Sequence, residues 1–101
     1  MRYKKFETYE HQKAIFKFTD SKVQSKFDVE KEDIVLPENS ENITWKWESN
    51  WFVQVNQHFT DKQGWQYSPD GQSNFKGEML MTDFHRRRKW VRVAAAFLKT
   101  P

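Results

Sequence analysis

The stretch His85-Arg86-Arg87-Arg88-Lys89-Trp90-Val91-Arg92 decides the fold of this chain. Side chains of a β-strand point alternately to its two faces, because the strand repeats every two residues. A strand here therefore places four large side chains on one face, namely Arg86, Arg88, Trp90 and Arg92. A buried arginine has to be paired or stacked, since an isolated buried charge is strongly destabilising. The sequence therefore predicts aromatic partners for these guanidinium groups inside the molecule.

A second stretch, Trp45-Lys46-Trp47-Glu48-Ser49-Asn50-Trp51, supplies such partners. The same alternation places Trp45, Trp47 and Trp51 on a single face. A guanidinium group over an indole ring gains about 0.5–2 kcal/mol, depending on how far the pair is desolvated. Together with Trp65, the two stretches predict a structural stack of interleaved Arg and Trp side chains in place of an aliphatic core.

Length and composition indicate one domain that covers residues 1–101. The chain has only three leucines and three isoleucines, whereas 17% of its residues are aromatic. Each aromatic side chain buries roughly 150–250 Å², so these residues have to supply most of the core. We divide the domain into an N-terminal part of about residues 3–56 and a C-terminal part of about residues 64–93.

Alternating patterns predict strands, and the helical propensity of Ala94-Ala95-Ala96 is confined to a short terminal run. We expect strands near residues 2–10, 13–19, 33–36, 45–56, 65–67 and 84–97. Ser68-Pro69-Asp70-Gly71 is typical of a type I turn, and residues 75–81 form a loop or an edge strand. The expected class is all-β, a single antiparallel two-layer domain with long loops.

Charge is distributed unevenly along the chain, although the net charge is only +3. Residues 1–26 carry seven Lys or Arg against three acids, and residues 27–44 carry six acids against Lys31. A net charge this small does not indicate a nucleic-acid partner, although stacked aromatics leave single-stranded nucleic acid as a minor alternative. We expect no nucleic-acid partner and a monomer.

Catalytic and cofactor chemistry is not indicated. His11, His58 and His85 lie in three different expected elements and lack metal-ligand spacing. The chain has no cysteine, and three glycines do not build a phosphate-binding loop. We therefore expect no enzyme, no cofactor and no metal. The absence of cysteine, of a signal peptide and of a long apolar run favours a cytosolic setting.

The basic run has three interpretations: a nucleic-acid or nuclear-localisation patch, the structural Arg/Trp stack, and a membrane-facing basic patch. Alternation favours the stack, and it leaves His85, Arg87 and Lys89 on the opposite face, available to anionic headgroups. Met79-Leu80-Met81 is either a buried edge strand or an apolar loop that enters a bilayer beside these cations. In the second interpretation, the candidate lipid-binding residues are Met79, Leu80, Met81, His85, Arg87 and Lys89.

Several of these motifs resemble the DysF domain of dysferlin, fungal peroxins and a fungal sporulation protein. The resemblance rests on Trp-x-Trp-x-x-x-Trp at 45–51, Gly-Trp-x-Tyr at 64–67, and the basic run at 85–92. Tyr9-Glu10-His11-Gln12-Lys13 also resembles the opening motif of that family, with Lys13 at an arginine position. The resemblance implies long antiparallel strands, interleaved Arg and Trp side chains, no enzymatic activity, and work at membranes.

The expected function is a non-enzymatic, peripheral membrane-associated module that binds anionic phospholipid, either phosphatidic acid or a phosphoinositide. The resemblance implies the cytosolic side of an organelle membrane, in peroxisome and endoplasmic-reticulum organisation or in prospore-membrane growth. The alternative is a protein-interaction adaptor that recruits a membrane-protein partner through the acidic loop or through an edge of the sheet.

Overall fold

The computed structural model describes residues 1–14, 17–19 and 23–99. Two long strands dominate it, β1 (Arg2–Lys13) and β6 (His85–Leu98). The shorter strands are β2 (Ser25–Phe27), β3 (Ile43–Trp47), β4 (Phe52–Val53) and β5 (Gln66–Ser68). A single 3₁₀ turn, η1 (Lys31–Asp33), is the only helical element of the described residues. The all-β, antiparallel class predicted from the sequence is confirmed.

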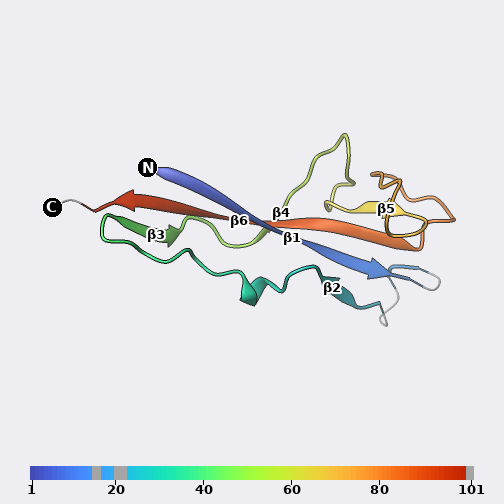
Figure 1. The fold of residues 1–101 in the computed structure, drawn as a ribbon. Coiled ribbons are helices and arrows are strands. Elements are labelled where there is room, and N and C mark those ends of the chain that lie inside the picture. Colours follow the sequence, from blue (N-terminus) through green and yellow to red (C-terminus); the bar gives the residue numbers. More distant parts are fainter. Residues whose placement is uncertain (15–16, 20–22, 100–101) are drawn as a thin grey trace.

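β6 lies at the centre of the sheet and pairs with every described strand except β2. β1 runs antiparallel along one edge of β6, from Arg2 opposite Ala96 to Lys13 opposite His85. β3, β4 and β5 follow one another along the other edge, and β2 pairs with the end of β1. Figure 1 shows the result, a twisted ribbon of two long strands with short strands beside it. The molecule measures 60 × 27 × 21 Å, and the described strands form one sheet rather than two stacked sheets.

The register of β1 against β6 assigns each side chain to one of two faces, because directly opposite residues share a face. Face A carries the even-numbered residues of both strands, so Glu10 lies opposite Arg88 and Gln12 lies opposite Arg86. Face B carries the odd-numbered residues, so His11 lies opposite Arg87. The alternation of side chains therefore separates the cations of β6 into two sets with different neighbours.

The strand expected over residues 45–56 is interrupted. β3 ends at Trp47, and the backbone N–H groups of Glu48 and Ser49 both donate to the carbonyl of Val93, at 2.8 and 3.2 Å. Two residues opposite one are the mark of a β-bulge, which displaces the register before β4 begins. Ser49 is one of the two positions that break the alternating pattern of this segment, so the irregularity is visible in the sequence.

Other boundaries also differ from expectation. β1 continues to Lys13, where a second strand over 13–19 was expected to begin, and the rest of that segment lies partly outside the described residues. η1 occupies part of the segment in which the short strand near 33–36 was expected. Ala94-Ala95-Ala96 belongs to β6, because backbone pairing with β1 on one edge and β3 on the other outweighs the local helical propensity of the alanines.

The apolar core is small and lies at the β5 end of the ribbon. It consists of Ala14, Phe18, Trp65 and Tyr67, with Val23 packed against them. Along β6, the buried residues are Val91 and the three alanines. The middle of the ribbon is therefore filled by long polar and aromatic side chains, whose contacts decide what each cation of β6 can do.

Candidate functional site

Arg86 lies between two aromatic rings on face A. Its guanidinium carbon is 3.9 Å from the ring centroid of Trp65 and 4.4 Å from that of Phe18. Its Nε donates a hydrogen bond to Oε1 of Gln12 at 2.8 Å. Burial lowers the pKa of Arg86, and the Tyr67 hydroxyl partly offsets that effect. An arginine remains charged at neutral pH even so, and this one is held within the structure.

Arg88, the next cation on face A, shares Trp65 with Arg86. Its guanidinium carbon lies 4.3 Å from the ring of Trp65 and 5.2 Å from that of Trp90. Its Nε donates to Oε1 of Glu10 at 2.6 Å, and the Trp90 indole N–H donates to the same oxygen at 2.8 Å. The buried Glu10 therefore links an arginine and a tryptophan of β6 to β1.

Glu10 is ionised in this setting. Burial raises the pKa of its carboxyl group, but hydrogen bonds from Ser25, Trp90 and Arg88 together outweigh burial and lower the pKa. The Ser25 hydroxyl donates to the second carboxylate oxygen, so the network also includes β2. A carboxylate bound by this many donors is favoured in its charged form.

Arg92 is the third arginine that lies over a tryptophan, with its guanidinium carbon 4.0 Å from the ring of Trp47. Its Nε donates to the carbonyl of Ser49 at 2.9 Å, which ties the β-bulge to β6. Trp45 lies opposite Ala96 in the sheet, not beside an arginine. Trp45 and Trp51 are half-buried, and among the described residues neither has an arginine over its ring. The three tryptophans of 45–51 therefore do not form one continuous ladder with the arginines, because β3 pairs with the alanine half of β6.

Two cations on face B, Arg87 and Lys89, also contact side chains of the same molecule. Arg87 lies between Phe75 and Tyr9, with its guanidinium carbon 3.6 and 4.5 Å from their ring centroids. Lys89 lies 3.4 Å from a carboxylate oxygen of Glu7. The sequence placed Arg87 and Lys89 free on this face, whereas both have intramolecular partners, because face B has aromatic and acidic residues of its own. His85 differs, since it is half-buried and its imidazole ring lies against Gly71.

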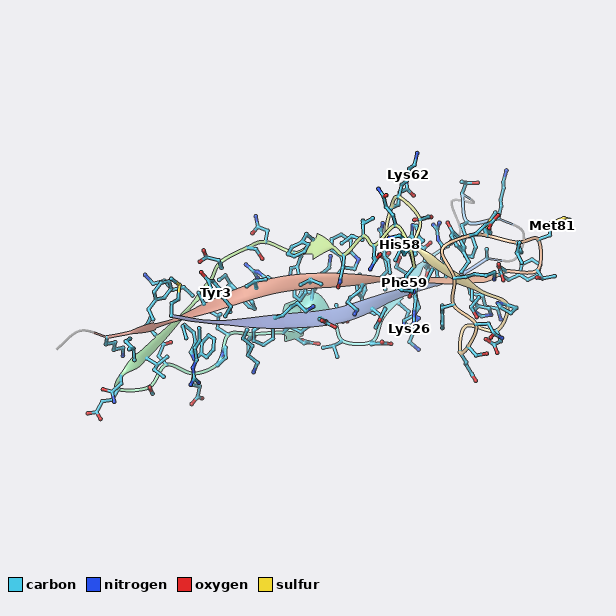
Figure 2. All side chains as sticks on the ribbon, turned by 90° about the horizontal axis from the view of Figure 1, so that it is seen from above. Tyr3, Lys26, His58, Phe59, Lys62 and Met81 are labelled. Carbon is cyan, nitrogen blue, oxygen red and sulfur yellow. The ribbon has the colours of Figure 1, made fainter. Side chains whose placement is uncertain are left out.

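Met79-Leu80-Met81 forms the exposed tip of a loop. The three residues are 57%, 52% and 96% exposed, so the buried-edge-strand interpretation does not describe them. Asp83 fixes the base of the tip, because its Oδ2 accepts the Leu80 backbone N–H at 2.7 Å and lies 2.7 Å from Nζ of Lys76. Figure 2 shows Met81 projecting from the far end of the molecule.

Sequence reasoning did not assign a place beside the cations to five residues that position them. They are Tyr9, Glu10, Gln12, Phe18 and Phe75. Three of them belong to β1, so the signal that could have found them is the pairing of β1 with β6. That register places a polar or aromatic residue of β1 opposite or next to each arginine. Phe18 and Phe75 come from loops and carry no such signal.

The acidic segment crosses the sheet between β2 and β3, and Figure 1 shows it passing below β1 and β6. Its six carboxylates are all exposed: Asp28, Glu30, Glu32, Asp33, Glu38 and Glu41. Lys31 is the one basic residue of this segment, and its Nζ lies 4.0 Å from the ring centroid of Trp90. The lysine therefore anchors the segment on face A, and of the six acids Asp28 lies 2.9 Å from Nε2 of His11.

One stretch of sheet edge is open. β2 covers β1 only at residues 10–12, and Asp28 N–H donates to the Tyr9 carbonyl at 3.0 Å. Backbone groups of successive residues point to opposite sides of a strand. Those of Tyr3, Lys5 and Glu7 therefore point away from β6, in the same direction as those of Tyr9. Within the described ranges, no backbone group pairs with them.

In the described part of the chain, no helical segment is long and apolar enough to cross a membrane. No group of three or more His, Asp or Glu side chains in the same residues is arranged to hold a metal ion.

Comparison with known proteins gives partial matches. No family model matches the chain. It is 42% identical over 52 residues to tectonin beta-propeller repeat-containing protein 1 of Homo sapiens and 41% identical over 49 residues to that of Gallus gallus. It is also 38% identical over 48 residues to a tectonin beta-propeller repeat-containing protein of Drosophila melanogaster. These matches cover 50%, 48% and 46% of this chain, and the chain spans about 4% of the length of each relative.

The prediction of a DysF domain is contradicted by these matches. The curated proteins that resemble the chain are named for tectonin β-propeller repeats, and they do not point to peroxisomes or sporulation. The motifs behind the prediction describe how cations and aromatics pack on a strand. A packing pattern of this kind is set by the physics of a sheet and does not by itself identify a family or a function.

Proposed function

We propose that the chain is a non-enzymatic protein-interaction module that pairs an extended segment of its partner with the open edge of β1. The observation that supports this proposal is the row of backbone groups at Tyr3, Lys5 and Glu7, which have no backbone partner among the described residues. Such a row is a template for one more strand, and main-chain hydrogen bonds then supply the affinity.

The side chains beside this edge define the chemistry of the partner. Arg2 and Lys4 are exposed on face A, and Tyr3 is exposed on face B. Lys5 is already close to a carboxylate, with its Nζ 3.0 Å from Glu7. A partner strand with acidic residues at alternate positions places its carboxylates beside Arg2 and Lys4, and opposite charges across neighbouring strands are stabilising. The similarity to proteins named for β-propeller repeats supports an interaction role, because repeat architectures present binding surfaces.

Substitution at Lys5 tests the proposal. Proline removes the outward N–H without removing a hydrogen bond to β6, and it blocks strand addition. Lys5→Ala removes the same charge and keeps the N–H, so it is the matched control. We expect the wild type and Lys5→Ala to capture the same proteins from cell extract. Lys5→Pro should not capture them. Identical capture by all three folded proteins would contradict the edge as the binding site.

A second candidate is contact with an anionic membrane surface, at the cytosolic side of an organelle. The exposure of Met79, Leu80 and Met81 at a loop tip favours it, because apolar groups that enter the headgroup region contribute to interfacial binding. The contacts made by Arg87 and Lys89 weaken it, since these cations already have partners.

Flotation with acidic and neutral vesicles separates the two candidates. Membrane contact predicts that the wild type floats with acidic vesicles and that Met81→Asp does not. Val35→Asp introduces the same charge at another exposed apolar residue and should leave flotation unchanged. Equal flotation of the wild type with both vesicle types would remove this candidate.

A further inference from the structure

A cleft of about 360 Å³ opens at the β5 end of the sheet, apart from the open edge of β1. Nine described residues line it, and none of these is a carboxylate. Five of them carry cationic or protonatable nitrogen groups: His11, Lys13, Lys26, His85 and Arg86. Its composition is therefore one-sided in charge, in a chain with a net charge of only +3.

The register explains how these groups come together. Lys26 of β2 lies opposite His11, and His11 in turn lies opposite Arg87 of β6. Two residues further along the same face, Lys13 lies opposite His85. Face B thus places two rows of nitrogen groups side by side, with the cations Lys13 and Lys26 next to the two histidines.

Intramolecular partners account for only part of this charge. His11 lies 2.9 Å from Oδ1 of the exposed Asp28, and Arg87 is stacked between two rings. Lys13 and Lys26 are exposed, and among the described residues neither forms an ion pair. Two lysines therefore remain to bind an anion, beside a histidine on the cleft wall.

The walls of the cleft are held in place. The ring of His85 lies against Gly71, which adopts a φ of +76° and leaves no room for a Cβ atom. The turn before Gly71 is fixed by Asp70, whose carboxylate accepts backbone N–H groups from Gln72 and Ser73 at 2.9 Å each. Asp70 itself is not among the described residues that line the cleft.

We infer that this cleft binds a phosphate monoester carried by a phosphorylated serine or threonine of a partner polypeptide. A phosphomonoester carries a charge of about −1.5 to −2 and three acceptor oxygens, which suits several convergent N–H donors. The cleft opens beside β2, whose only partner among the described strands is β1, so an extended chain has access to it.

A lipid headgroup has the same phosphate chemistry, but the arrangement of the molecule favours a polypeptide. Figure 2 shows Lys26 on one side of the ribbon, whereas Met81 projects from its end. A flat bilayer that met the apolar tip would therefore not face the cleft. This inference is independent of the open edge of β1, and the variants that test it leave that edge unchanged.

Titration with short peptides tests the inference. The probes are a serine pentapeptide in phosphorylated and unphosphorylated form, inorganic phosphate as a competitor, and phosphatidylcholine vesicles with and without phosphatidic acid. The test variant is Lys13→Ala/Lys26→Ala, and the control is Lys46→Ala/Lys62→Ala, which removes the same charge from exposed lysines elsewhere. The far-UV and thermal unfolding profiles of both variants should match those of the wild type.

We expect the phosphopeptide to bind and the unphosphorylated peptide not to bind. Two lost charged hydrogen bonds should weaken binding at least about tenfold in the test variant, with no change in the control and with competition by inorganic phosphate. Three results would overturn the inference: equal binding of both peptides, an equal loss in both variants, or binding of phosphatidic acid vesicles without binding of the phosphopeptide.

Discussion

At the scale of single residues, Trp65 is the side chain on which the cation arrangement depends most. It is almost fully buried, and both Arg86 and Arg88 lie over its ring. By contrast, Trp47 has one arginine over its ring and is only half-buried. Neighbouring arginines repel each other, so the ring and the acceptors of β1 together make their proximity possible.

Trp65→Ala should therefore be more destabilising than Trp47→Ala. Loss of a buried tryptophan typically costs about 3–5 kcal/mol, and here two guanidinium groups also lose their stacking partner. We expect a loss in that range for Trp65→Ala and a smaller one for Trp47→Ala, measured by urea unfolding. Equal losses would mean that shared stacking on Trp65 contributes little.

Glu10 is the acceptor on which two β6 side chains depend. Glu10→Ala should lower the free energy of unfolding by about 3–5 kcal/mol, because it leaves Arg88 partly buried without its carboxylate. Glu10→Gln has nearly the same shape and retains one acceptor oxygen, so its loss should be smaller. If both variants unfold like the wild type, the ion pair with Arg88 does not stabilise the fold.

The lowered pKa of Glu10 also predicts a pH dependence. The contribution of its charge to stability is complete above the ordinary pKa of 4.5 and is lost as pH falls through the lower pKa of the folded state. Between pH 7 and about pH 3.5, the wild type should therefore lose more stability than Glu10→Gln. Parallel loss in both proteins would assign the acid sensitivity to other carboxylates.

At the scale of elements, the bulge at Ser49 determines how β3 and β4 share one edge of β6. The Ser49 side-chain oxygen accepts the Val93 N–H at 3.0 Å, and its backbone carbonyl accepts Arg92 Nε. A bulge bends a strand and increases its twist. Across the bulge the register shifts by two residues, from Trp47 opposite Ala94 to Val53 opposite Trp90, so Trp47 and Val53 both remain on face A.

Ser49→Ala should destabilise the protein by about 1–3 kcal/mol, because the Val93 N–H loses its acceptor. Asn50→Ala is a suitable control, since Asn50 is exposed and adjacent in sequence. Urea unfolding measures both. Hydrogen exchange should locate the effect at Val93, and unchanged exchange there would show that this hydrogen bond is dispensable.

At the scale of the whole molecule, the sequence predicts the features that follow from side-chain alternation within one strand. It does not predict the contacts that depend on which strands pair. Alternation in the basic run correctly separates the cations of β6 into two faces, because period two is a local property. The partners of those cations depend on which strand pairs with which and in what register. Tyr9 and Phe75 enclose Arg87 although they lie far apart in the chain, and no local pattern encodes that contact.

The same dependence explains why Trp45 and Trp51 lie away from the arginines. The register of β3 places Trp45 beside the alanines at the end of β6, and Trp51 follows the bulge, outside β3. For a related reason, the sequence does not decide whether Met79-Leu80-Met81 is a buried edge strand or an exposed loop. Whether an apolar triplet is buried depends on the elements that cover it, which local spacing does not determine.

The open edge of β1 makes a prediction for hydrogen exchange across the whole ribbon. Amides that point toward β6, such as those of Phe6 and Thr8, should exchange slowly. Those of Lys5 and Glu7 point away from β6 and should exchange fast. His11 also points away, but β2 covers it, so its amide should be protected and serves as the internal control. Uniform protection along β1 would show that its outer edge is covered in solution, and the edge could not then be free to receive a partner strand.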